Sequence, residues 1–296
     1  MLSIIHHPDY DAATVGDDHR FPMRKYTLVA ELLAERGYSF EQPRHATQAA
    51  LEQAHASSYV RSVLTSALDT KSARRVGFEM TPAIAARTCA SVGGTELAAR
   101  RALETGRAVN LAGGSHHADF EGGAGFCVFN DVAVAALSLL QEGIVKRIAV
   151  LDLDVHHGDG TARIFADDPR VFTASLHCEQ NWPREKPPSD LDVGLEKGTA
   201  DEAYLDAAKA FVAEALEASK PDLVFYNAGV DPHTEDRLGL LSLSDNGLQA
   251  RDTLVAQSCL DLGVPIVGVL GGGYSKDAAA VARRHTFLIE ALEKTT

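Results

Sequence analysis

The sequence predicts an α/β fold in which a parallel sheet carries helices on both faces. Short apolar runs alternate along the chain with longer segments of helical periodicity, as expected for parallel strands joined by crossover helices. The run at 148–151, Ile-Ala-Val-Leu, is apolar throughout, which is typical of a strand covered on both faces. No internal repeat, low-complexity run or linker interrupts the alternation, so we expect one domain that spans residues 1–296.

Each expected element has its own sequence signal. The strands are short apolar runs, at residues 2–5, 108–111, 148–151, 171–176, 223–226 and 265–270. The helices follow a helical pattern, at residues 21–36, 51–63, 82–103, 131–141, 202–216, 245–262 and in a last segment ending near 293. Gly37 ends the first helix, while Asn130 or Asp131 and Ser244 supply N-caps for two others. The segment 178–199, which contains several prolines, is expected to be a long loop.

The composition is that of an ordinary globular protein, and it disfavours two kinds of partner. Apolar residues make up 45% of the 296 positions, and the net charge of -13 offers no field for binding nucleic-acid phosphates. No apolar run approaches the roughly 20 residues of a membrane span, and the first ten residues lack the pattern of a signal peptide. The cysteines are far apart, with no CxxC pair, as expected for reduced thiols in the cytoplasm.

The stretch 147–161 carries the densest group of candidate metal ligands. Asp152, Asp154 and His156 alternate directly after a buried strand, so an extended backbone places them on one side. Carboxylates this close repel one another unless a cation joins them, and a mixed His/Asp set suits zinc or iron better than magnesium. For a single His-Asp pair a polar turn without a metal is the alternative, but the number of such residues up to Asp159 favours the metal.

Other strand ends deliver complementary groups to the same edge of the sheet, where open α/β folds bind ligands. These groups are His116-His117, residues 175–177, Asp231 and Tyr274. Catalytic zinc needs about three protein ligands and an open position, and Asp231 is the best third candidate. The alternative for Asp231 is a turn cap before Pro232.

The remaining groups at this edge fit acid–base chemistry. An imidazole such as His116 or His117 titrates near neutrality, and Asp152 and Asp159 are available to orient the two rings. Tyr274 follows three glycines and can donate a hydrogen bond to an oxyanion. The alternative for His116 and His117 is a loop pair without a role, and the alternative for Tyr274 is an ordinary aromatic packed in a loop. Together, these groups indicate metal-assisted hydrolysis of an amide or ester.

On these motifs, the chain resembles the histone deacetylase superfamily, which includes bacterial acetoin-utilisation-type deacetylases and acetylpolyamine amidohydrolases. The resemblance covers nearly the whole chain, and its motifs lie at residues 113–118, 125–131, 151–160, 227–231 and 271–274. It implies an arginase/deacetylase-like three-layer α/β/α sandwich with a mostly parallel eight-stranded sheet.

The resemblance also implies two cation sites. One zinc ion, for which ferrous iron is an alternative, would be held by Asp154, His156 and Asp231. A structural potassium ion would lie behind it, at Asp152, Asp154, His156, Ser175 and Leu176.

The resemblance further implies the catalytic roles. His117, paired with Asp159, would be the general base and then the acid that protonates the leaving amine. His116, paired with Asp152, would act electrostatically, and Tyr274 would polarise the acyl carbonyl. The substrate tunnel would be formed by Gly125, Phe126, Trp182, Glu79 and Gly272. In addition, Arg24 would match the arginine of an internal acetate channel.

The predicted function is a zinc-dependent amidohydrolase that removes acetyl or longer acyl groups from an acylated lysine peptide or protein. An acetylpolyamine amidohydrolase, or a hydrolase of another small acylated amine, is the alternative among enzymes, and the acidic surface suits a cationic substrate. A catalytically silent acyl-lysine binder is the alternative of another class, and a binuclear manganese hydrolase would share the fold. We expect a cytoplasmic monomer or weak homo-oligomer without nucleic-acid or membrane partners.

Overall fold

A sheet of seven parallel strands forms the middle of the molecule. The computed structural model describes residues 2–12, 15–16 and 19–294. Within this part of the chain, the strand order is β1-β2-β7-β6-β3-β4-β5, and every neighbouring pair is parallel. The strands are β1 (Ser3–Ile5), β2 (Arg107–Asn110), β3 (Ile148–Asp152), β4 (Val171–Cys178), β5 (Leu191–Leu195), β6 (Leu223–Asn227) and β7 (Ile266–Val269). The predicted α/β sandwich is confirmed, with one strand fewer than the eight that the resemblance implied.

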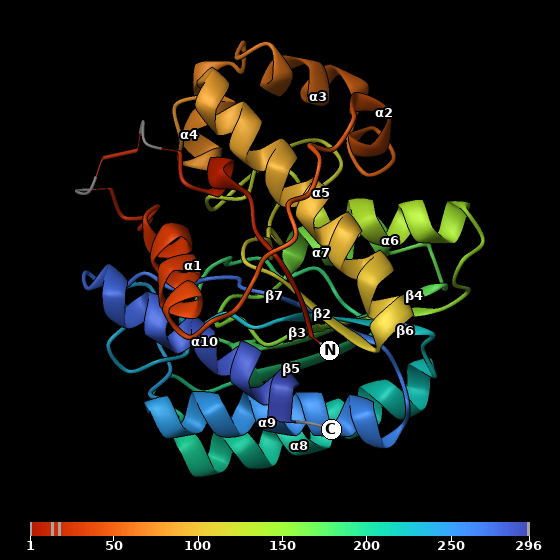
Figure 1. The fold of residues 1–296 in the computed structure, drawn as a ribbon, viewed down its shortest axis with the longest axis vertical. Helices are drawn as coiled ribbons and strands as arrows, with labels where there is room; N and C mark the ends of the chain where they lie inside the picture. The colour runs from red at the N-terminus through yellow and green to blue at the C-terminus, as the bar shows by residue number, and fades with distance from the viewer. Residues whose placement is uncertain (1, 13–14, 17–18, 295–296) are drawn as a thin grey trace.

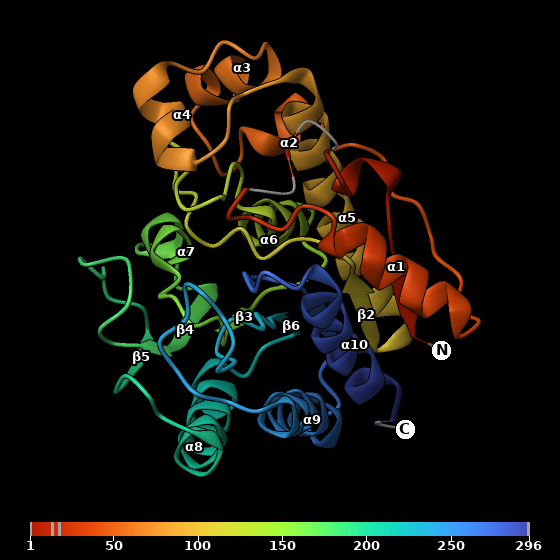
Figure 2. The ribbon, with the colours of Figure 1, turned by 90° about the vertical axis from the view of Figure 1, so that its left-hand side faces the viewer.

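Helices cover both faces of this sheet, as Figures 1 and 2 show. The helices are α1 (Lys25–Glu35), α2 (Gln48–Leu51), α3 (Ser57–Leu64), α4 (Thr70–Val76), α5 (Pro82–Thr105), α6 (Asp131–Gln141), α7 (Asp159–Phe165), α8 (Asp201–Ser219), α9 (Asp245–Asp261) and α10 (Ala278–Lys294). Helix α5 packs on β1 and β2 and against α6, while α8 packs on β3 and β4, with α9 beside α8 and α10 beside α9. None of the helices in the described ranges has the length and apolarity needed to cross a membrane.

Three segments differ from the sequence prediction. The expected helix at 51–63 is divided into α2 and α3, because the backbone N–H of Ala56 and the ring of His55 bond to the carbonyls of Phe120 and Asp119. Helix α4 lies between the expected helices 51–63 and 82–103, where the sequence predicted no element. The expected loop at 178–199 contains the edge strand β5, which pairs with β4 over five residues.

The predicted helix caps are confirmed, and they fix where two loops at the carboxyl edge of the sheet end. The side chain of Asn130 accepts the backbone N–H of Ala133 at 2.9 Å, and Ser244 accepts that of Gly247 at 3.1 Å. These bonds satisfy backbone donors that the first helical turn leaves unpaired. The loops that precede α6 and α9 therefore end at defined points above the carboxyl ends of the strands.

Candidate active site

The carboxyl ends of β3 and β6 bring three candidate metal ligands together. These strands are neighbours in the sheet. Asp154 and His156 follow β3 and Asp231 follows β6, and all three side chains are buried. The His156 Nδ1 atom lies 3.1 Å from Asp154 Oδ1 and 3.2 Å from Asp231 Oδ2. One donor atom from each residue lies within 4.8 Å of the other two, so a single ion can reach all three.

The residues of this cluster fit a divalent metal ion. Asp231 Oδ1 accepts the backbone N–H of Val155 at 3.0 Å, whereas Asp231 Oδ2 is buried without a hydrogen-bond partner. Such an orphaned carboxylate oxygen is costly unless a cation lies against it. Gly272 donates its N–H to Asp154 Oδ2 at 2.7 Å, and a Cβ at this position would lie only 2.0 Å from Asp231 Oδ2. Two carboxylates and one imidazole form a donor set that zinc accepts, and the absence of a side chain at Gly272 leaves room beside the carboxylates.

The charges of the cluster also favour a cation. Burial on its own lowers the pKa of His156, but the adjacent carboxylates of Asp154 and Asp231 raise it to about 10. Burial and the charge of Asp154 raise the pKa of Asp231 to about 7. Both shifts show that the site favours positive charge between its carboxylates, and a metal ion would supply that charge.

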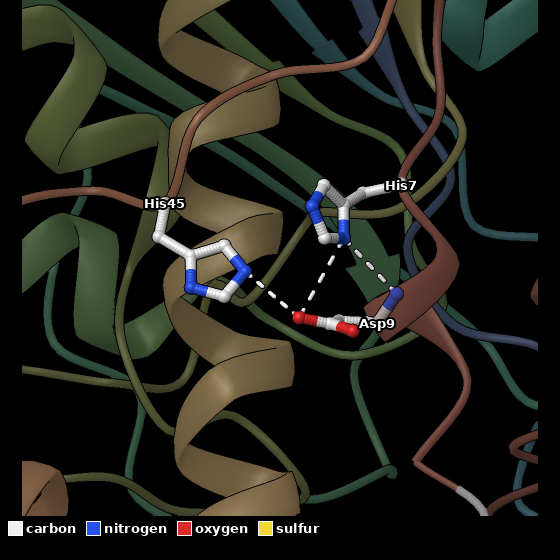
Figure 3. A group of neighbouring side chains, drawn as sticks. All are labelled: His7, Asp9 and His45. Carbon is white, nitrogen blue, oxygen red and sulfur yellow. Dashed lines mark hydrogen bonds and ion pairs between the residues drawn. The ribbon is translucent and has the colours of Figure 1, made fainter.

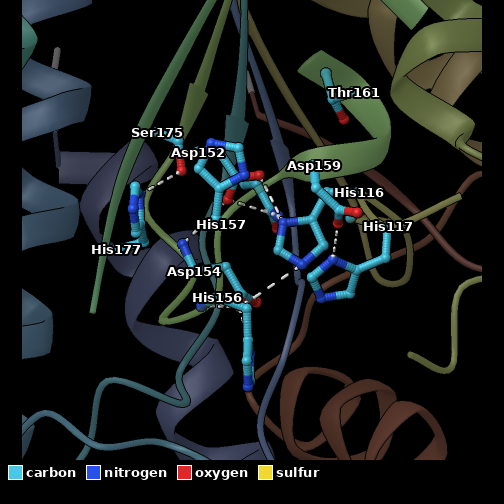
Figure 4. A network of polar contacts seen from close by, with 12 residues as sticks. His116, His117, Asp152, Asp154, His156, His157, Asp159, Thr161, Ser175 and His177 are labelled. Carbon is cyan, nitrogen blue, oxygen red and sulfur yellow. Dashed lines mark hydrogen bonds and ion pairs between the residues drawn. The ribbon is translucent and has the colours of Figure 1, made fainter. Parts of the chain in front are cut away.

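A pair of histidines lies beside the candidate ligands (Figure 4). The rings of His116 and His117, in the loop after β2, have centroids 3.9 Å apart. His116 Nδ1 lies 2.6 Å from Asp152 Oδ2, and His117 Nδ1 lies 2.7 Å from Asp159 Oδ1. Each carboxylate holds the Nδ1 side of its ring, which fixes the orientation and the tautomer of the imidazole. Arg163, one turn along α7, donates to the other oxygen of Asp159.

The two imidazoles occupy different electrostatic environments. Burial and the neighbouring His116 lower the pKa of His117 to about 3, although Asp159 acts in the opposite direction. Burial lowers the pKa of His116 as well, but the charge of Asp152 outweighs it and raises the pKa to about 9. Opposite shifts in neighbouring groups are typical of sites that assign acid and base roles to different residues. Here the neutral ring is His117.

A cavity of about 300 Å³ leads from the surface to these groups. It is lined by Arg20, His117, Gly125, Phe126, His156, Asn181, Trp182, Leu238 and Tyr274. The Trp182 ring lies 4.4 Å from that of His117, and with 45% of its surface exposed it marks the mouth of the cavity. Gly125 has φ +53°, and a Cβ there would lie 2.8 Å from His117 and 2.9 Å from Trp182. A larger residue would therefore narrow the cavity.

Comparison with known proteins identifies the family. The family model described as "Histone deacetylase domain" matches residues 19–290. The chain belongs to the histone deacetylase family. It is 45% identical over 289 residues to an uncharacterised protein of Picosynechococcus sp. (strain ATCC 27264 / PCC 7002 / PR-6), covering 96% of each chain.

Named relatives and a solved structure agree with this assignment. Histone deacetylase 2 of Arabidopsis thaliana is 31% identical over 295 residues, which cover 95% of this chain and 76% of that one. The acetoin utilization protein AcuC of Bacillus subtilis (strain 168) is 29% identical, covering 91% and 76%. The crystal structure of the HDA15 HD domain shares the fold, with a TM-score of 0.81 at 23% identity, covering 99% of this chain and 91% of that one. Membership of a deacetylase family makes the chain a hydrolase that acts on amides, and histone deacetylases are generally zinc-dependent.

Not every residue that the sequence pointed to lies in the cavity wall. Glu79 is exposed in the connection between α4 and α5, and Gly272 lies behind the wall, against the candidate ligands. Arg24 is also exposed and lines an outer cavity, whereas its neighbour Lys25 is fully buried. The Lys25 ammonium donates to the carbonyl of Gly271 at 2.9 Å. Of these two neighbouring basic residues, it is therefore Lys25 and not Arg24 that reaches the loop behind the candidate ligands.

The sequence did not single out three residues of the wall. Arg20, Asn181 and Leu238 come from three separate loops, and each has ordinary neighbours in the sequence. The stretches that contain them carry no periodic pattern or motif. Only the packing of the loops over the strand ends brings them together.

A second histidine group connects the strands behind the site (Figure 4). His157 Nε2 lies 3.0 Å from Asp192 Oδ1 on β5, and His177 Nδ1 lies 3.0 Å from Ser175 Oγ on β4. The rings of His157 and His177 meet edge to face at 4.7 Å. The residue that follows His156 is therefore tied to the edge strand β5, which the sequence prediction treated as part of a loop.

A third group, His7, Asp9 and His45, lies away from the cavity (Figure 3). The Nδ1 atom of His7 accepts the backbone N–H of Asp9 at 3.0 Å and so caps the short 3-10 helix Pro8–Tyr10. His45 Nε2 lies 2.8 Å from Asp9 Oδ2. These bonds occupy one nitrogen of each histidine and one oxygen of the carboxylate, and they account for the group without an ion.

Proposed function

We propose that this chain is a zinc-dependent amidohydrolase that removes acetyl or longer acyl groups from the amine of acyl-lysine. One observation carries the proposal. The cavity that His117 and His156 line ends at the candidate ligands, where Asp231 Oδ2 has no hydrogen-bond partner and lies 3.2 Å from His156. The His117–Asp159 pair lies beside this cluster. The ligand cluster fits a Lewis-acidic ion, and the histidine pair fits proton transfer to and from a reacting water and amine.

Asp154, His156 and Asp231 would hold the ion, which when bound supplies polarisation of the acyl carbonyl and of a water molecule. His117, with its neutral ring oriented by Asp159, accepts the proton of the attacking water and passes it to the leaving amine. His116, held by Asp152 at 2.6 Å, acts electrostatically on the negative charge that develops on the substrate.

Tyr274 supplies the remaining interaction with the acyl group. Its side chain lines the cavity, with its ring 6.2 Å from that of His156. Burial, together with the charges of Asp154 and Asp231, raises the pKa of the phenol well above its ordinary value of 10. The hydroxyl therefore remains protonated at neutral pH and can donate to the oxygen that gains charge in the transition state.

The cavity wall supports a linear acylated amine as substrate. Phe126 and Trp182 offer apolar faces for a methylene chain, and Gly125 leaves the space between them open. We further propose a structural potassium ion behind the metal site, at Asp152, Asp154, His156, Ser175 and Leu176. In support, the pairing of β3 with β4 sets Asp152 opposite Ser175.

The proposal is tested by steady-state hydrolysis of an acetyl-lysine peptide by the zinc-loaded protein. His117→Ala and Tyr274→Phe should each lower kcat/KM at least about 100-fold, which is the usual contribution of acid–base and oxyanion groups. The matched controls are His45→Ala and Tyr38→Phe, which lie outside the cavity and should retain the wild-type rate. Wild-type rates in both cavity variants would refute the mechanism. Zinc binding without turnover of any acylated amine would instead favour a silent binder.

A second candidate is an acetylpolyamine amidohydrolase, which the net charge of -13 favours because the substrate is a cation. The same assay, run with an acetyl-lysine peptide, a long-chain acyl-lysine peptide and acetylputrescine, separates the two. A higher kcat/KM for acetylputrescine would replace the lead proposal. A bound-zinc stoichiometry near one would count against a binuclear centre.

A further inference from the structure

A buried arginine lies directly behind the two loops that carry the candidate metal ligands. Arg251 on α9 is 0% exposed. Its Nη1 atom donates to the carbonyl of Leu153 at 3.2 Å and to that of Gly229 at 2.5 Å, and its Nη2 atom reaches the carbonyl of Ala228 at 3.4 Å. Leu153 directly precedes Asp154, and Ala228 and Gly229 lead into Asp231. One side chain thus connects the backbone of both ligand loops.

The guanidinium of Arg251 is itself held in place. Asp252 Oδ1 accepts from Arg251 Nε at 3.0 Å and lies 2.9 Å from Nη2. The hydroxyl of Tyr226, the residue before the last of β6, donates to the same oxygen at 2.5 Å. Both partners are almost completely buried. The planar fork of the arginine is therefore fixed at one end by a carboxylate and aims its other donors at the loops.

Stability alone does not explain this arrangement. Arg251 lies between Leu248 and Val255 in the largely apolar buried stripe of α9, a position that an apolar residue usually occupies. A buried ion pair is often no more stabilising than well-packed apolar residues of similar size. The backbone contacts give a specific reason, because in the described part of the chain no other donor reaches the carbonyls of Leu153 and Gly229.

The two loops are also in close contact at the ligands. A Cβ on Gly229 would lie 2.4 Å from Asp154 Oδ2 and 2.9 Å from Asp231 Oδ1. A small shift of the backbone at 228–229 relative to 153 would therefore change the distance between the two carboxylates. Because a metal site tolerates only a few tenths of an ångström in its ligand distances, such a shift would weaken binding.

We propose that Arg251 is a positioning residue that sets the separation of Asp154 and Asp231, and with it the affinity of the site for a divalent metal ion. This inference rests on the proposed metal site. Arg251 acts through the backbone of the two loops and Asp252 orients it, so neither residue needs to touch the ion or the substrate. Partners of this kind, one layer outside the ligands, typically change metal affinity by 10–100-fold when they are replaced.

The test is the zinc Kd of the full chain, measured by competition with a chromogenic chelator, together with the Tm of the metal-free protein. Arg251→Met should weaken zinc binding at least about tenfold. Arg251→Lys keeps the charge but loses the planar fork, and should weaken binding by several-fold. The matched control is Arg87→Met. Arg87 is also buried, but its guanidinium donates to Met23 Sδ and to the Tyr26 hydroxyl and not to a ligand loop. This control should lower the Tm and leave the zinc Kd unchanged.

The outcomes separate the inference from the proposal beneath it. A wild-type zinc Kd in folded Arg251→Met overturns the positioning role, as does the same loss of affinity in Arg87→Met, which would indicate general loosening. If Arg251→Met does not fold, the Arg251→Lys variant decides, and a wild-type Kd there also overturns the role. Failure of the wild-type protein to bind zinc would refute the metal site itself, and that result is seen before any variant is made.

Discussion

Protonation of His55 should destabilise the fold as the pH falls below 6.5, and glutamine at this position should remove that part of the pH dependence. His55 is 0% exposed. Its Nε2 atom accepts the backbone N–H of Asn130 at 2.9 Å, so Nδ1 must carry the proton that is donated to the carbonyl of Asp119 at 2.8 Å. Both nitrogens are thus used by the neutral ring. A second proton, on Nε2, would face the N–H of Asn130 directly and break this bond.

The structure gives the size of this effect. Burial lowers the pKa of His55 from 6.5 to about 4, with the hydrogen bond to the Asp119 carbonyl acting in the opposite direction. Because the folded pKa lies below the unfolded one, the unfolded chain binds the proton more readily. The associated stability is complete above the unfolded pKa and is lost as the pH falls toward the folded pKa. At about pH 5 the loss amounts to roughly 2 kcal/mol of unfolding free energy.

Urea unfolding of the wild-type protein and of His55→Gln, near pH 7 and near pH 5, measures this difference. Glutamine can donate to the Asp119 carbonyl and accept from Asn130 without titrating. The wild-type protein should lose about 2 kcal/mol more than the variant between the two pH values. His45→Gln, whose ring is 41% exposed, is the matched control and should follow the wild type. Equal losses in the wild type and His55→Gln would refute the reasoning.

Three further predictions concern the site. Gly125→Ala should lower kcat/KM for an acyl-lysine peptide about tenfold or more, because its Cβ would lie 2.9 Å from Trp182 at a backbone φ of +53°; an unchanged rate would show that the cavity adapts. Lys25→Met should reduce kcat more than it raises KM, because the ammonium holds the Gly271 carbonyl at 2.9 Å; Lys25→Arg should restore part of the rate, and a pure KM effect would contradict this role. Removing the metal with a chelator should lower the unfolding free energy of the wild type by about 3 kcal/mol, compared with the protein in zinc at 100 times its Kd. The unfolding free energy of Asp231→Asn should not change. Identical melting curves of the wild type with and without zinc would count against a metal at this site.

Local interactions along the chain made much of the fold predictable from the sequence. The period of apolar residues separates strands from helices, and Asn130 and Ser244 cap helices with their own side chains, so these features need no distant partner. The alternation of Asp154 and His156 after a buried strand likewise follows from backbone geometry. The family resemblance rests on such short motifs, and the match of the histone deacetylase domain to residues 19–290 confirms it.

Only the tertiary structure decided which strand ends are neighbours and which side chains they enclose. Asp231 faces Asp154 because β6 pairs with β3. The last residues of these strands, Asp152 and Asn227, are register partners although they lie 75 positions apart in the sequence, so the strand register and not the spacing brings them together. Strand β5 exists because the edge of β4 supplies its hydrogen-bond partners.

The buried cations show the same limit of the sequence. Arg251 and Lys25 are charged residues that the sequence would place in solvent, yet both lie behind the strand ends and donate to loop carbonyls. Arg251 left one local signal, its place in the apolar stripe of α9, but the identity of its acceptors depends on how α9 packs over β3 and β6. The sequence alone determined the elements and the chemical groups, because these depend on neighbours along the chain. Long-range packing decided their distances and environments, and with them the charges that the site can hold.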